Sequence, residues 1–492
     1  MMTSAHILPI SDLHQDFLHD ESRLAGLAEY ICFPQDIQEA VEAFLWAKQQ
    51  QIAATIQGSR TGIVGGAVPL GGLVVNLSKM TQIGPVTGDT QQGCQVVVGP
   101  GVLCQQLNDQ LAKKRLFFAP DPTETTATIG GMFSHNARGL CGYRYGSTAD
   151  HVLGITLLRP DGTLMELARG QCCFDSCGCT LPDGTRLELE QLPQHSEVPC
   201  VPTCGMDLID LIAGSEGVLG AVVQLTLRVL PCVEEPWGVA FFYETEEKAL
   251  AFCEGVRAKA LAGICCMEFF DRFSLKRVEQ MKEISTTLKA LTEFPKNSNA
   301  AVYLEVSHPD SAVVDDTLME LLTEFSEQGG AEKESRAVSG QAAVKIFHQM
   351  RHAVPESVNM SIDLLRQTVP EAHKFGLDFS CPQLACPEQY KLYTSIIEEL
   401  GLPYVIFGHA AERHLHCNLV PSNAEQLALC PQAVARLAEA FSSKGANLCS
   451  ENGVGKLKAK YMTLTEKEKQ AMACVRDFFD PQRCMNPKDL WE

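Results

Sequence analysis

IQGSRTGIVGGAVPLGG, which spans Ile56–Gly72, is the most informative segment of this chain. Its six glycines stand between two short apolar runs that are typical of strands. The segment is not a P-loop, because no Gly-Lys-Ser/Thr triplet ends it, and it is not a dinucleotide-binding fingerprint, because a strand rather than a helix follows. Two readings stay open: the backbone N–H groups form a nest for an anion such as pyrophosphate, or the glycines serve tight turns that need a positive φ.

Two other loops have a similar composition. They are PDPTETTATIGG (Pro120–Gly131), with threonines and paired glycines, and GSEGVLG (Gly214–Gly220). Three Gly/Ser/Thr-rich loops in one half of the chain favour a single extended, phosphate-bearing cofactor over three unrelated turns.

The segments around these loops predict a mixed α+β fold. Asp36 and Glu39 form a capping-box pair at the start of a helix over 36–50. A second helix is expected over 102–115, and strands over 51–57, 73–77, 96–98 and 220–230. After Pro231 and Pro236 we expect helices at 246–262, 311–327, 341–353, 387–400, 424–443 and 465–479, and strands at 238–243, 300–306, 403–407 and 414–420.

Composition excludes several classes of protein. The length of 492 residues suggests two to four domains, and 45% hydrophobic and 20% charged residues are ordinary for a globular protein. The net charge is −20. The negative charge argues against nucleic-acid binding and against docking on anionic lipid. The first twenty residues lack the apolar stretch of a signal peptide, and we find no apolar run long enough for a membrane span. A cytoplasmic location is therefore expected.

Cysteine is unusually frequent, with 21 residues scattered along the chain. An odd, dispersed set without a signal peptide fits a reducing compartment better than a disulfide framework. Six of these cysteines fall in an insertion-like stretch over 170–205, at positions 172, 173, 177, 179, 200 and 204. Their spacing matches no zinc or ferredoxin pattern, so we interpret them as reduced structural thiols.

Histidines cluster in GHAAERHLHCNL, residues 408–419. His414, His416 and Asn418 alternate, so on a strand they share one face, and His409 lies in the loop before it. Imidazoles that converge in this way can bind Zn²⁺ or another divalent ion, or can move protons. A purely structural histidine network is the alternative.

Five stretches together carry a resemblance to a known family. Residues 57–80, 120–139, 145–162, 214–231 and 480–491 resemble the FAD-linked 2-hydroxy acid dehydrogenases of the p-cresol methylhydroxylase/vanillyl-alcohol oxidase superfamily. Members include D-lactate dehydrogenases, the flavin subunit of glycolate oxidase and D-2-hydroxyglutarate dehydrogenase. The resemblance implies a two-lobed FAD-binding domain over 20–235, interrupted by the insertion at 170–205, and an α+β substrate-cap domain over 236–492.

The resemblance also implies which residues hold FAD. It assigns the pyrophosphate to Gly58, Ser59, Arg60, Thr61, Gly62 and Gly65. It assigns the isoalloxazine and ribityl groups to Pro120, Asp121, Thr128, Gly130, Gly131, Asn136, Gly217 and Val222. The loop Gln57–Gly62 contains no His or Cys that could tether the flavin, so non-covalent FAD is expected.

Two family motifs appear here in altered form. The family pattern Gly-His-x-Gly-Asp-Gly-Asn-x-His keeps His409 and His416, and the family pattern Glu-His-Gly-x-Gly keeps Glu451. These three residues are therefore the implied ligands of Zn²⁺ or another divalent metal. Asn452 stands where the family has a histidine that acts as a base, and Asn cannot take up a proton at neutral pH. His414 is the nearest replacement.

Two cations are candidates for binding a substrate carboxylate. Arg351 lies in QMRHAVPESVN (349–359), which resembles a family segment whose arginine has that role, and a guanidinium suits bidentate binding. Lys374, in HKFGLDFSCP (373–382), is a second candidate. For each residue, an ordinary solvated role is the alternative.

The leading functional hypothesis is FAD-dependent oxidation of a small 2-hydroxy carboxylate, of the D-lactate or glycolate type, to the 2-oxo acid. The resemblance implies an electron-transfer flavoprotein or an iron–sulfur subunit as electron acceptor. One alternative is an electron-relay subunit with a degenerate substrate site. Another is an FAD-containing transferase of the same superfamily, whose phosphate-bearing substrate would need an extra cation such as Arg413.

Overall fold

The chain divides into two units. The computed structural model describes residues 6–89, 93–122, 124–233, 235–487 and 491. Outside these lie part of the N-terminal stretch (residues 1–5), Thr123 of the predicted cofactor loop, and residues 488–490 of the C-terminal motif. Unit 1 comprises Met1–Gly139, Gly146–Cys232 and Glu451–Glu492, and unit 2 comprises Leu140–Tyr145 and Val233–Ser450. The sequence predicts a single domain boundary between residues 235 and 236. In the structure the last segment of the chain, Glu451–Glu492, belongs to unit 1 as well.

The first lobe of unit 1 is a small sheet in the order β1-β2-β4-β3, with parallel pairing of β2 and β3 to β4. Its strands are β1 (Leu8–Pro9), β2 (Tyr30–Cys32), β3 (Ala54–Gln57) and β4 (Leu73–Asn76). The helix α1 (Ile37–Gln50) begins at Asp36, whose side chain accepts a hydrogen bond from Glu39 N, as the capping pattern predicts. α1 buries Ala40, Ala43, Phe44 and Ala47 in the core of this lobe. The glycine-rich segment is the connection from β3 to β4.

The second lobe of unit 1 is an antiparallel sheet in the order β5-β6-β12-β8-β9, with β7 paired to β12. Its strands are β5 (Thr87–Asp89), β6 (Gly93–Val98), β7 (Leu116–Phe117), β8 (Val152–Leu158), β9 (Leu164–Ala168) and β12 (Ala221–Pro231). Four helices pack into the core of this lobe: α2 (Cys104–Ala112), α3 (Ile129–Ser134), α5 (Leu208–Ile212) and α13 (Glu466–Phe479). The short helix α12 (Gly455–Lys458) lies against the first glycine-rich loop, where Leu457 N donates to Val64 O at 3.1 Å. The Cys-rich stretch adds the hairpin β10 (Gly178–Thr180) and β11 (Arg186–Glu188), and Cys172, Cys179 and Cys200 are buried in the same core.

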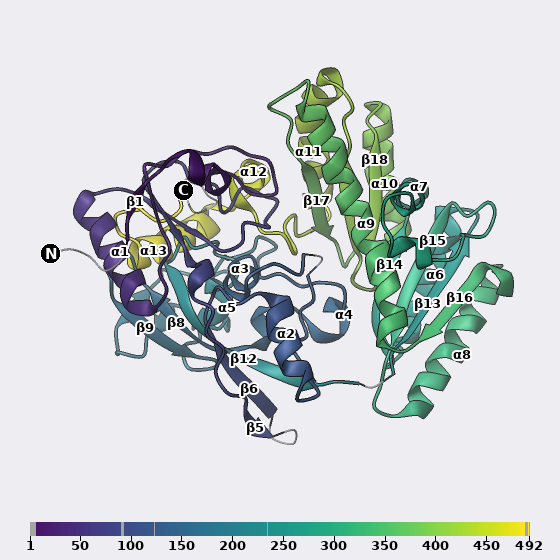
Figure 1. Ribbon diagram of the computed structural model, residues 1–492, viewed down its shortest axis with the longest axis horizontal. Coiled ribbons are helices and arrows are strands. Elements are labelled where there is room, and N and C mark those ends of the chain that lie inside the picture. The colour runs from purple at the N-terminus through teal and green to yellow at the C-terminus, as the bar shows by residue number, and fades with distance from the viewer. Residues whose placement is uncertain (1–5, 90–92, 123, 234, 488–490, 492) are drawn as a thin grey trace. The chain divides into compact units, whose positions relative to one another are not determined.

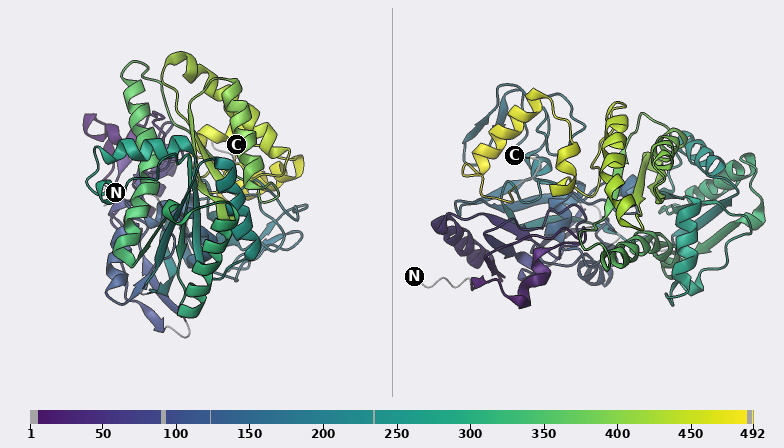
Figure 2. Two further views of the ribbon diagram at one scale, coloured as in Figure 1. Left: turned by 90° about the vertical axis from the view of Figure 1, so that its right-hand side faces the viewer. Right: turned by 90° about the horizontal axis from the view of Figure 1, so that it is seen from above.

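The C-terminal helix α13 is part of the core of unit 1. Its residues Ala471, Met472, Val475 and Phe479 are buried in the same apolar cluster as β6, β8 and β12. In the views of Figures 1 and 2, α13 (yellow) accordingly lies among the purple and blue elements of the N-terminal region. Unit 1 is therefore built from segments at both ends of the chain.

Unit 2 is one antiparallel sheet with helices on both faces. The strand order is β16-β13-β15-β14-β18-β19-β17. The strands are β13 (Trp237–Tyr243), β14 (Ile264–Phe270), β15 (Ala300–Val306), β16 (Ser335–Ser339), β17 (Phe375–Ser380), β18 (Tyr404–His409) and β19 (His414–Leu419). The helices are α4 (Gly142–Tyr145), α6 (Glu246–Lys259), α7 (Arg272–Lys282), α8 (Ser311–Glu327), α9 (Gln341–Arg366), α10 (Cys386–Glu399) and α11 (Ala424–Ser442).

The two faces of this sheet differ in chemistry. One face packs aromatic side chains against α6, α8, α10 and α11, for example Phe241 against Phe252 and Phe325, and Phe379 against Phe441. The other face is apolar where α7 and α9 cover it, as in the stack of Tyr303 on Phe347. On β14, β18, β19 and β17, however, the second face carries charged and imidazole side chains. That polar strip is where the site described below lies.

Helix α9 is longer than the sequence predicts. The expected helix ends at 353, whereas α9 continues through Pro355 to Arg366. Buried Val354, Val358 and Ile362 pack this half of α9 onto the sheet, which explains why the proline does not end the helix.

The cysteines and the hydropathy of the helices bear on the environment of the protein. All 21 cysteines lie among the described residues, and none of them is paired in a disulfide. Within the described part of the chain, no helix combines the length and hydropathy needed to cross a lipid bilayer.

Candidate functional site

The first two glycine-rich loops are tied together in unit 1. Ser59 Oγ donates to Thr126 O at 2.7 Å and accepts from Thr128 N at 3.1 Å. A Cβ on Gly58 would lie 2.1 Å from Thr128 Oγ1, so the close approach of the two loops requires glycine there. The predicted pyrophosphate loop and the predicted isoalloxazine loop are therefore neighbours.

The third loop meets the first at Glu216. A Cβ on Gly66 would lie 2.5 Å from Glu216 Oε2, and a Cβ on Gly217 would lie 3.3 Å from the Cβ of Ile56. The three loops thus converge in one place, as the sequence interpretation expects of a single cofactor site.

The remaining predicted cofactor residues lie on or beside these loops. Arg60 has a φ of 62° and its guanidinium lies 4.3 Å from the centre of the Phe17 ring. Asn136 has a φ of 48°, and its Oδ1 accepts from Ala149 N at 3.0 Å. The first loop contains Thr61, Gly62 and Gly65. The second loop and the start of α3 contain Pro120, Asp121, Gly130 and Gly131, and β12 contains Val222.

Glu216 is a residue of this junction that the sequence interpretation missed. Its Oε1 accepts from Val454 N at 2.7 Å and from Gly455 N at 2.9 Å, so it connects the third loop to the C-terminal segment. Burial raises the pKa of Glu216 to about 6, although the hydrogen bonds from Gly455 and Val454 oppose this rise. The signal in the sequence was an acidic residue inside an otherwise small and apolar loop, GSEGVLG.

The histidine cluster forms on the polar strip of unit 2. His414, His416 and Asn418 share one face of β19, and the register pairs His414 with His409 and His416 with Phe407 across β18. The ring centres lie 5.4 Å apart for His409 and His414, 5.1 Å for His409 and His416, and 4.7 Å for His414 and His416. The alternate residues Leu415, Cys417 and Leu419 are buried on the other side of the sheet.

Gly408 makes the close packing of these rings possible. It has a φ of +128°, and a Cβ there would lie 2.7 Å from Cδ2 of His416. Any other residue would therefore push His416 away from β18.

Glu268 on β14 links the histidines to Arg351. Its Oε1 lies 2.5 Å from His409 Nδ1, and its Oε2 accepts from Arg351 Nε at 3.3 Å. Burial opposes ionisation of Glu268, but His409, Arg351 and His416 outweigh burial and hold the pKa of the carboxyl below its usual value. The Arg351 guanidinium also lies 5.2 Å from the centre of the Phe407 ring. The structure therefore brings Arg351, His409, His414 and His416 into one group.

Glu268 and Asp378 are further polar residues of this strip that the sequence interpretation missed. Both are fully buried, and the register pairs Glu268 with His409 and Asp378 with His416. A lone acidic residue within each of the runs ICCMEFF (264–270) and FGLDFS (375–380) was the available signal.

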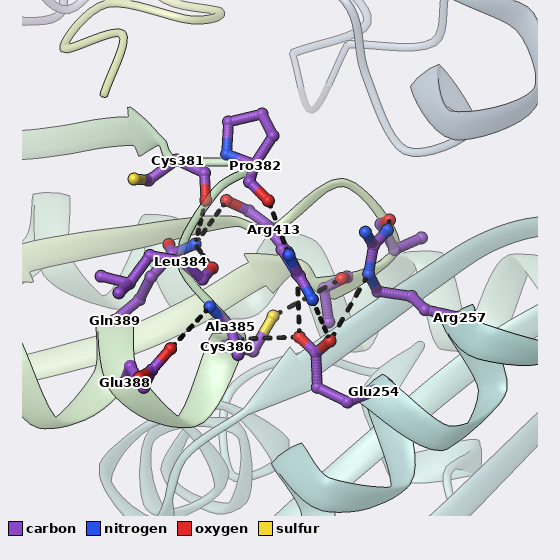
Figure 3. A network of polar contacts seen from close by, with 12 residues as sticks. Glu254, Arg257, Cys381, Pro382, Leu384, Ala385, Cys386, Glu388, Gln389 and Arg413 are labelled. Atoms are coloured by element: carbon purple, nitrogen blue, oxygen red, sulfur yellow. Dashed lines mark hydrogen bonds and ion pairs between the residues drawn. The ribbon is translucent and has the colours of Figure 1, made fainter. Parts of the chain in front are cut away.

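The turn between β18 and β19 is held by a network around Arg413 (Figure 3). Arg413 has a φ of 52° and donates to both carboxylate oxygens of Glu254, at 3.2 and 2.6 Å, and to Pro382 O at 2.6 Å. Glu254 also accepts from Cys386 N at 2.9 Å. This network anchors the turn whose two ends carry His409 and His414.

Two predicted residues, Lys374 and Glu451, belong to other segments of the chain. Lys374 is buried just before β17, and it lies four residues from Asp378, or about 13 Å along an extended strand. Glu451 is the first residue of the last segment of unit 1, where its Oε1 accepts from Gly139 N at 2.9 Å. Its participation with His409 and His416 in a metal site stays a prediction.

Comparisons with known proteins identify the family. Residues 28–168 match the FAD binding domain, and residues 238–490 match the C-terminal domain of FAD linked oxidases. The chain is 25% identical over 500 residues to D-lactate dehydrogenase of Anaerostipes hadrus, covering 98% of this chain and 94% of that protein. It is 24% identical over 472 residues to glycolate oxidase subunit GlcD of Bacillus subtilis, covering 95% and 89%.

A solved structure confirms the fold. 4-Ethylphenol oxidase from Gulosibacter chungangensis superposes with a TM-score of 0.69 at 14% identity, over 98% of this chain and 93% of that chain. The predicted α+β architecture, with an FAD-binding domain of the p-cresol methylhydroxylase type, is thus confirmed. The converging glycine loops and the two matched domains lead to one conclusion: the chain belongs to the FAD-linked oxidases and is an FAD-binding oxidoreductase.

Proposed function

We propose that this protein oxidises a small 2-hydroxy carboxylate, of the D-lactate or glycolate type, to the 2-oxo acid. The observation that carries the proposal is the group formed by Arg351, Glu268 and three histidines on one strip of unit 2. It combines a cation for a carboxylate with imidazoles that can take up a proton. The names of two relatives, a D-lactate dehydrogenase and a glycolate oxidase subunit, support this substrate class.

The convergent loops of unit 1 fit FAD. Gly58, Ser59, Arg60, Thr61, Gly62 and Gly65 would hold the pyrophosphate, and the second and third loops would hold the flavin ring. The fit rests on the glycines that let the loops approach one another and on the backbone N–H groups that such loops can offer to an anion. Because no His or Cys stands in the Gln57–Gly62 loop, we propose that FAD is bound without a covalent link.

Substrate oxidation breaks two bonds. The C2 hydrogen leaves with its electron pair as hydride, and the hydroxyl proton leaves to a base. FAD, when bound, supplies the acceptor for that hydride. Arg351 would bind the substrate carboxylate, because a guanidinium offers two parallel N–H donors. His414 would take the hydroxyl proton at its buried Nε2 atom, the role that Asn452 cannot fill.

The histidines also fit a divalent metal ion. Nδ1 of His409 faces Glu268, and a carboxylate behind an imidazole is the usual arrangement at metal-binding histidines. His409 and His416 would hold the ion, with Glu451 as the third ligand. Such an ion would lower the pKa of a bound hydroxyl group.

The alternatives differ in what they require. A transferase with a phosphate-bearing substrate would need an extra cation, but both carboxylate oxygens of Glu254 and Pro382 O already engage Arg413. An electron-relay subunit would need no proton-accepting histidine. The buried Glu268–His409 pair therefore favours the dehydrogenase proposal.

The electrons must leave the flavin for another protein. We propose an electron-transfer flavoprotein or an iron–sulfur subunit as this partner, since one relative carries the name of a glycolate oxidase subunit.

An anaerobic flavin-reduction screen tests the proposal. The purified yellow protein is mixed with D- and L-2-hydroxy acids without oxygen, and the loss of flavin absorbance is followed. We expect one acid to bleach the flavin within the time of a catalytic turnover. If no 2-hydroxy acid bleaches the flavin while dithionite does, the dehydrogenase proposal is wrong and the two alternatives, an electron-relay subunit and a transferase, take its place.

A further inference from the structure

A second group of metal-ligating side chains lies in unit 2. Cys141 precedes α4, Cys266 lies on β14 and Glu305 on β15. The two thiol sulfurs and one carboxylate oxygen of Glu305 all lie within 4.8 Å of one another. These residues are far apart in the sequence, and the fold alone brings them together.

The sheet fixes two of the three side chains. Cys266 and Glu305 are direct partners in the register of β14 and β15, so both point to the same face. Cys141 approaches from the Leu140–Tyr145 segment, and its Sγ lies 3.9 Å from Glu305 Oε2. In a tetrahedral zinc site, ligand atoms are separated by about 3.3–3.8 Å. Shifts of about 1 Å would therefore bring all three ligands onto one ion.

The Glu305 carboxylate is already oriented by its neighbours. Tyr303 Oη donates to Glu305 Oε1 at 2.9 Å, and His348 Nε2 contacts the same oxygen. Tyr303 in turn stacks on Phe347 with ring centres 4.8 Å apart. This arrangement leaves Oε2 on the side of Cys141, as a metal-ligating carboxylate supported by outer hydrogen bonds would be.

We propose that Cys141, Cys266 and Glu305 bind a thiophilic divalent cation, with Zn²⁺ as the preferred ion. Two thiolates and a carboxylate are a donor set that zinc accepts, and soft sulfur ligands discriminate against Mg²⁺ and Ca²⁺. The ion would clamp the Leu140–Tyr145 segment onto β14 and β15. Arg144 in the same segment already donates to Ser307 O and, at 3.3 Å, to Cys265 Sγ.

Cys141 and Cys266 must lose their protons to act as ligands, so binding of the cation would release protons. The site shares no ligand with the proposed histidine site, although Cys266 lies two residues before Glu268 on the same face of β14.

Zinc K-edge X-ray absorption on the FAD-loaded protein tests the proposal. The protein is purified without an affinity metal, equilibrated with Zn²⁺ and separated from free ions. We expect a sulfur shell at about 2.3 Å. The Cys141→Ser/Cys266→Ser variant should lose this shell and about one zinc ion per chain. Cys430→Ser is the matched control, since this buried thiol donates only within α11, to Gln426 O.

His416→Ala separates this site from the histidine cluster. It should keep the sulfur shell, whatever it does to nitrogen ligands. A wild-type spectrum without a sulfur shell, or a sulfur shell that survives in the double cysteine variant, overturns the proposal.

A labelling experiment on wild-type protein removes the risk that the double variant does not fold. Native protein is alkylated with and without Zn²⁺, and the labelled peptides are quantified. Zinc should slow labelling of half-buried Cys141 at least about tenfold, because only a free thiolate reacts quickly. Half-buried Cys474 is the internal control. Equal protection of both thiols, or protection of neither, contradicts the site.

Discussion

Glu268 is the residue on which the geometry of the proposed site depends most. It is fully buried and contacts both His409 and Arg351. In Glu268→Gln the shape is kept but the charge is lost. One of the two acceptor oxygens becomes an NH₂ donor, so the side chain can no longer accept from both His409 and Arg351, and Arg351 loses its counter-ion. We expect the rate of flavin reduction by the best 2-hydroxy acid to fall about 10- to 100-fold, by stopped-flow absorbance.

The control for Glu268 is Glu356→Gln, an exposed carboxylate on α9 that should not change the rate. FAD content should be unchanged in both variants, because Glu268 and Glu356 belong to unit 2 and the cofactor loops to unit 1. An unchanged rate in Glu268→Gln would remove this residue from the site.

His414 and His416 are expected to fail in different ways when each is replaced by alanine. His416→Ala should lower both the content of metal bound at the histidines and flavin bleaching, since His416 is a proposed ligand. His414→Ala should keep that metal but slow flavin reduction about 10²- to 10⁴-fold, the usual contribution of a general base. Metal analysis and anaerobic stopped-flow reduction on the same samples check this. Parallel loss of metal in both variants would contradict the division of roles.

At the level of elements, the turn between β18 and β19 should depend on the Glu254–Arg413 pair. Arg413→Ala removes both hydrogen bonds to Glu254 and keeps a side chain at a positive φ. Because these side chains are about three-quarters buried, we expect a coupling free energy of about 1 kcal/mol in a double-mutant cycle with Glu254→Gln, measured by urea unfolding. Flavin reduction should slow as well, since both ends of the turn carry site histidines.

The same pair sets a pH dependence. Burial opposes ionisation of Glu254, but Arg413 and Cys386 N hold its pKa below the usual value. The pair therefore stabilises the fold above about pH 4.3, and this contribution is lost as the pH falls through the lowered pKa of the folded state. As the pH falls through that range, the free energy of unfolding should decrease less in Arg413→Ala than in wild type. The exposed pair Arg436–Glu399 is the control, and Arg436→Ala should show a smaller effect.

Sequence patterns predict the elements better than they predict the site. The helix over 311–327 and the strand over 300–306 follow from periodicity and agree with α8 and β15. β14 was missed, because ICCMEFF is buried on both sides and has no alternation to detect. The Glu268–His409 contact joins residues 141 positions apart, so it depends on a strand pairing that no local pattern contains. His414 and His416 could be placed on one face because alternation is local.

On the scale of the whole molecule, FAD binding should be reversible. The three cofactor loops lie in unit 1. In the first of them, Gln57–Gly62 contains no His or Cys that could form a covalent link to the flavin. Acid precipitation should therefore release about one FAD per chain into the supernatant, measured by absorbance. Yellow colour that stays in the pellet would show a covalent flavin.

The C-terminal segment should control FAD affinity, because it closes unit 1 around the first cofactor loop. Asn486 Nδ2 donates to Gly66 O at 3.0 Å and to Glu216 O at 2.8 Å, and Asn486 Oδ1 accepts from Lys456 Nζ at 2.8 Å. One side chain thus ties the C-terminal segment to the first and third loops.

Asn486→Ala leaves these buried carbonyls without their donor, at a cost of about 1–3 kcal/mol. Asn486→Asp should destabilise this contact more than Asn486→Ala does, since it turns a carboxylate oxygen toward the same two carbonyls. We expect the Kd for FAD to rise about tenfold in the alanine variant and further in the aspartate variant, measured by titration of apoprotein with flavin fluorescence as readout. Asn299→Ala, an exposed asparagine of unit 2 that donates to Glu244 O, is the control and should bind FAD like wild type. If Asn486→Ala also binds FAD like wild type, the first cofactor loop keeps its shape without the C-terminal segment, and the affinity for FAD lies in the loops alone.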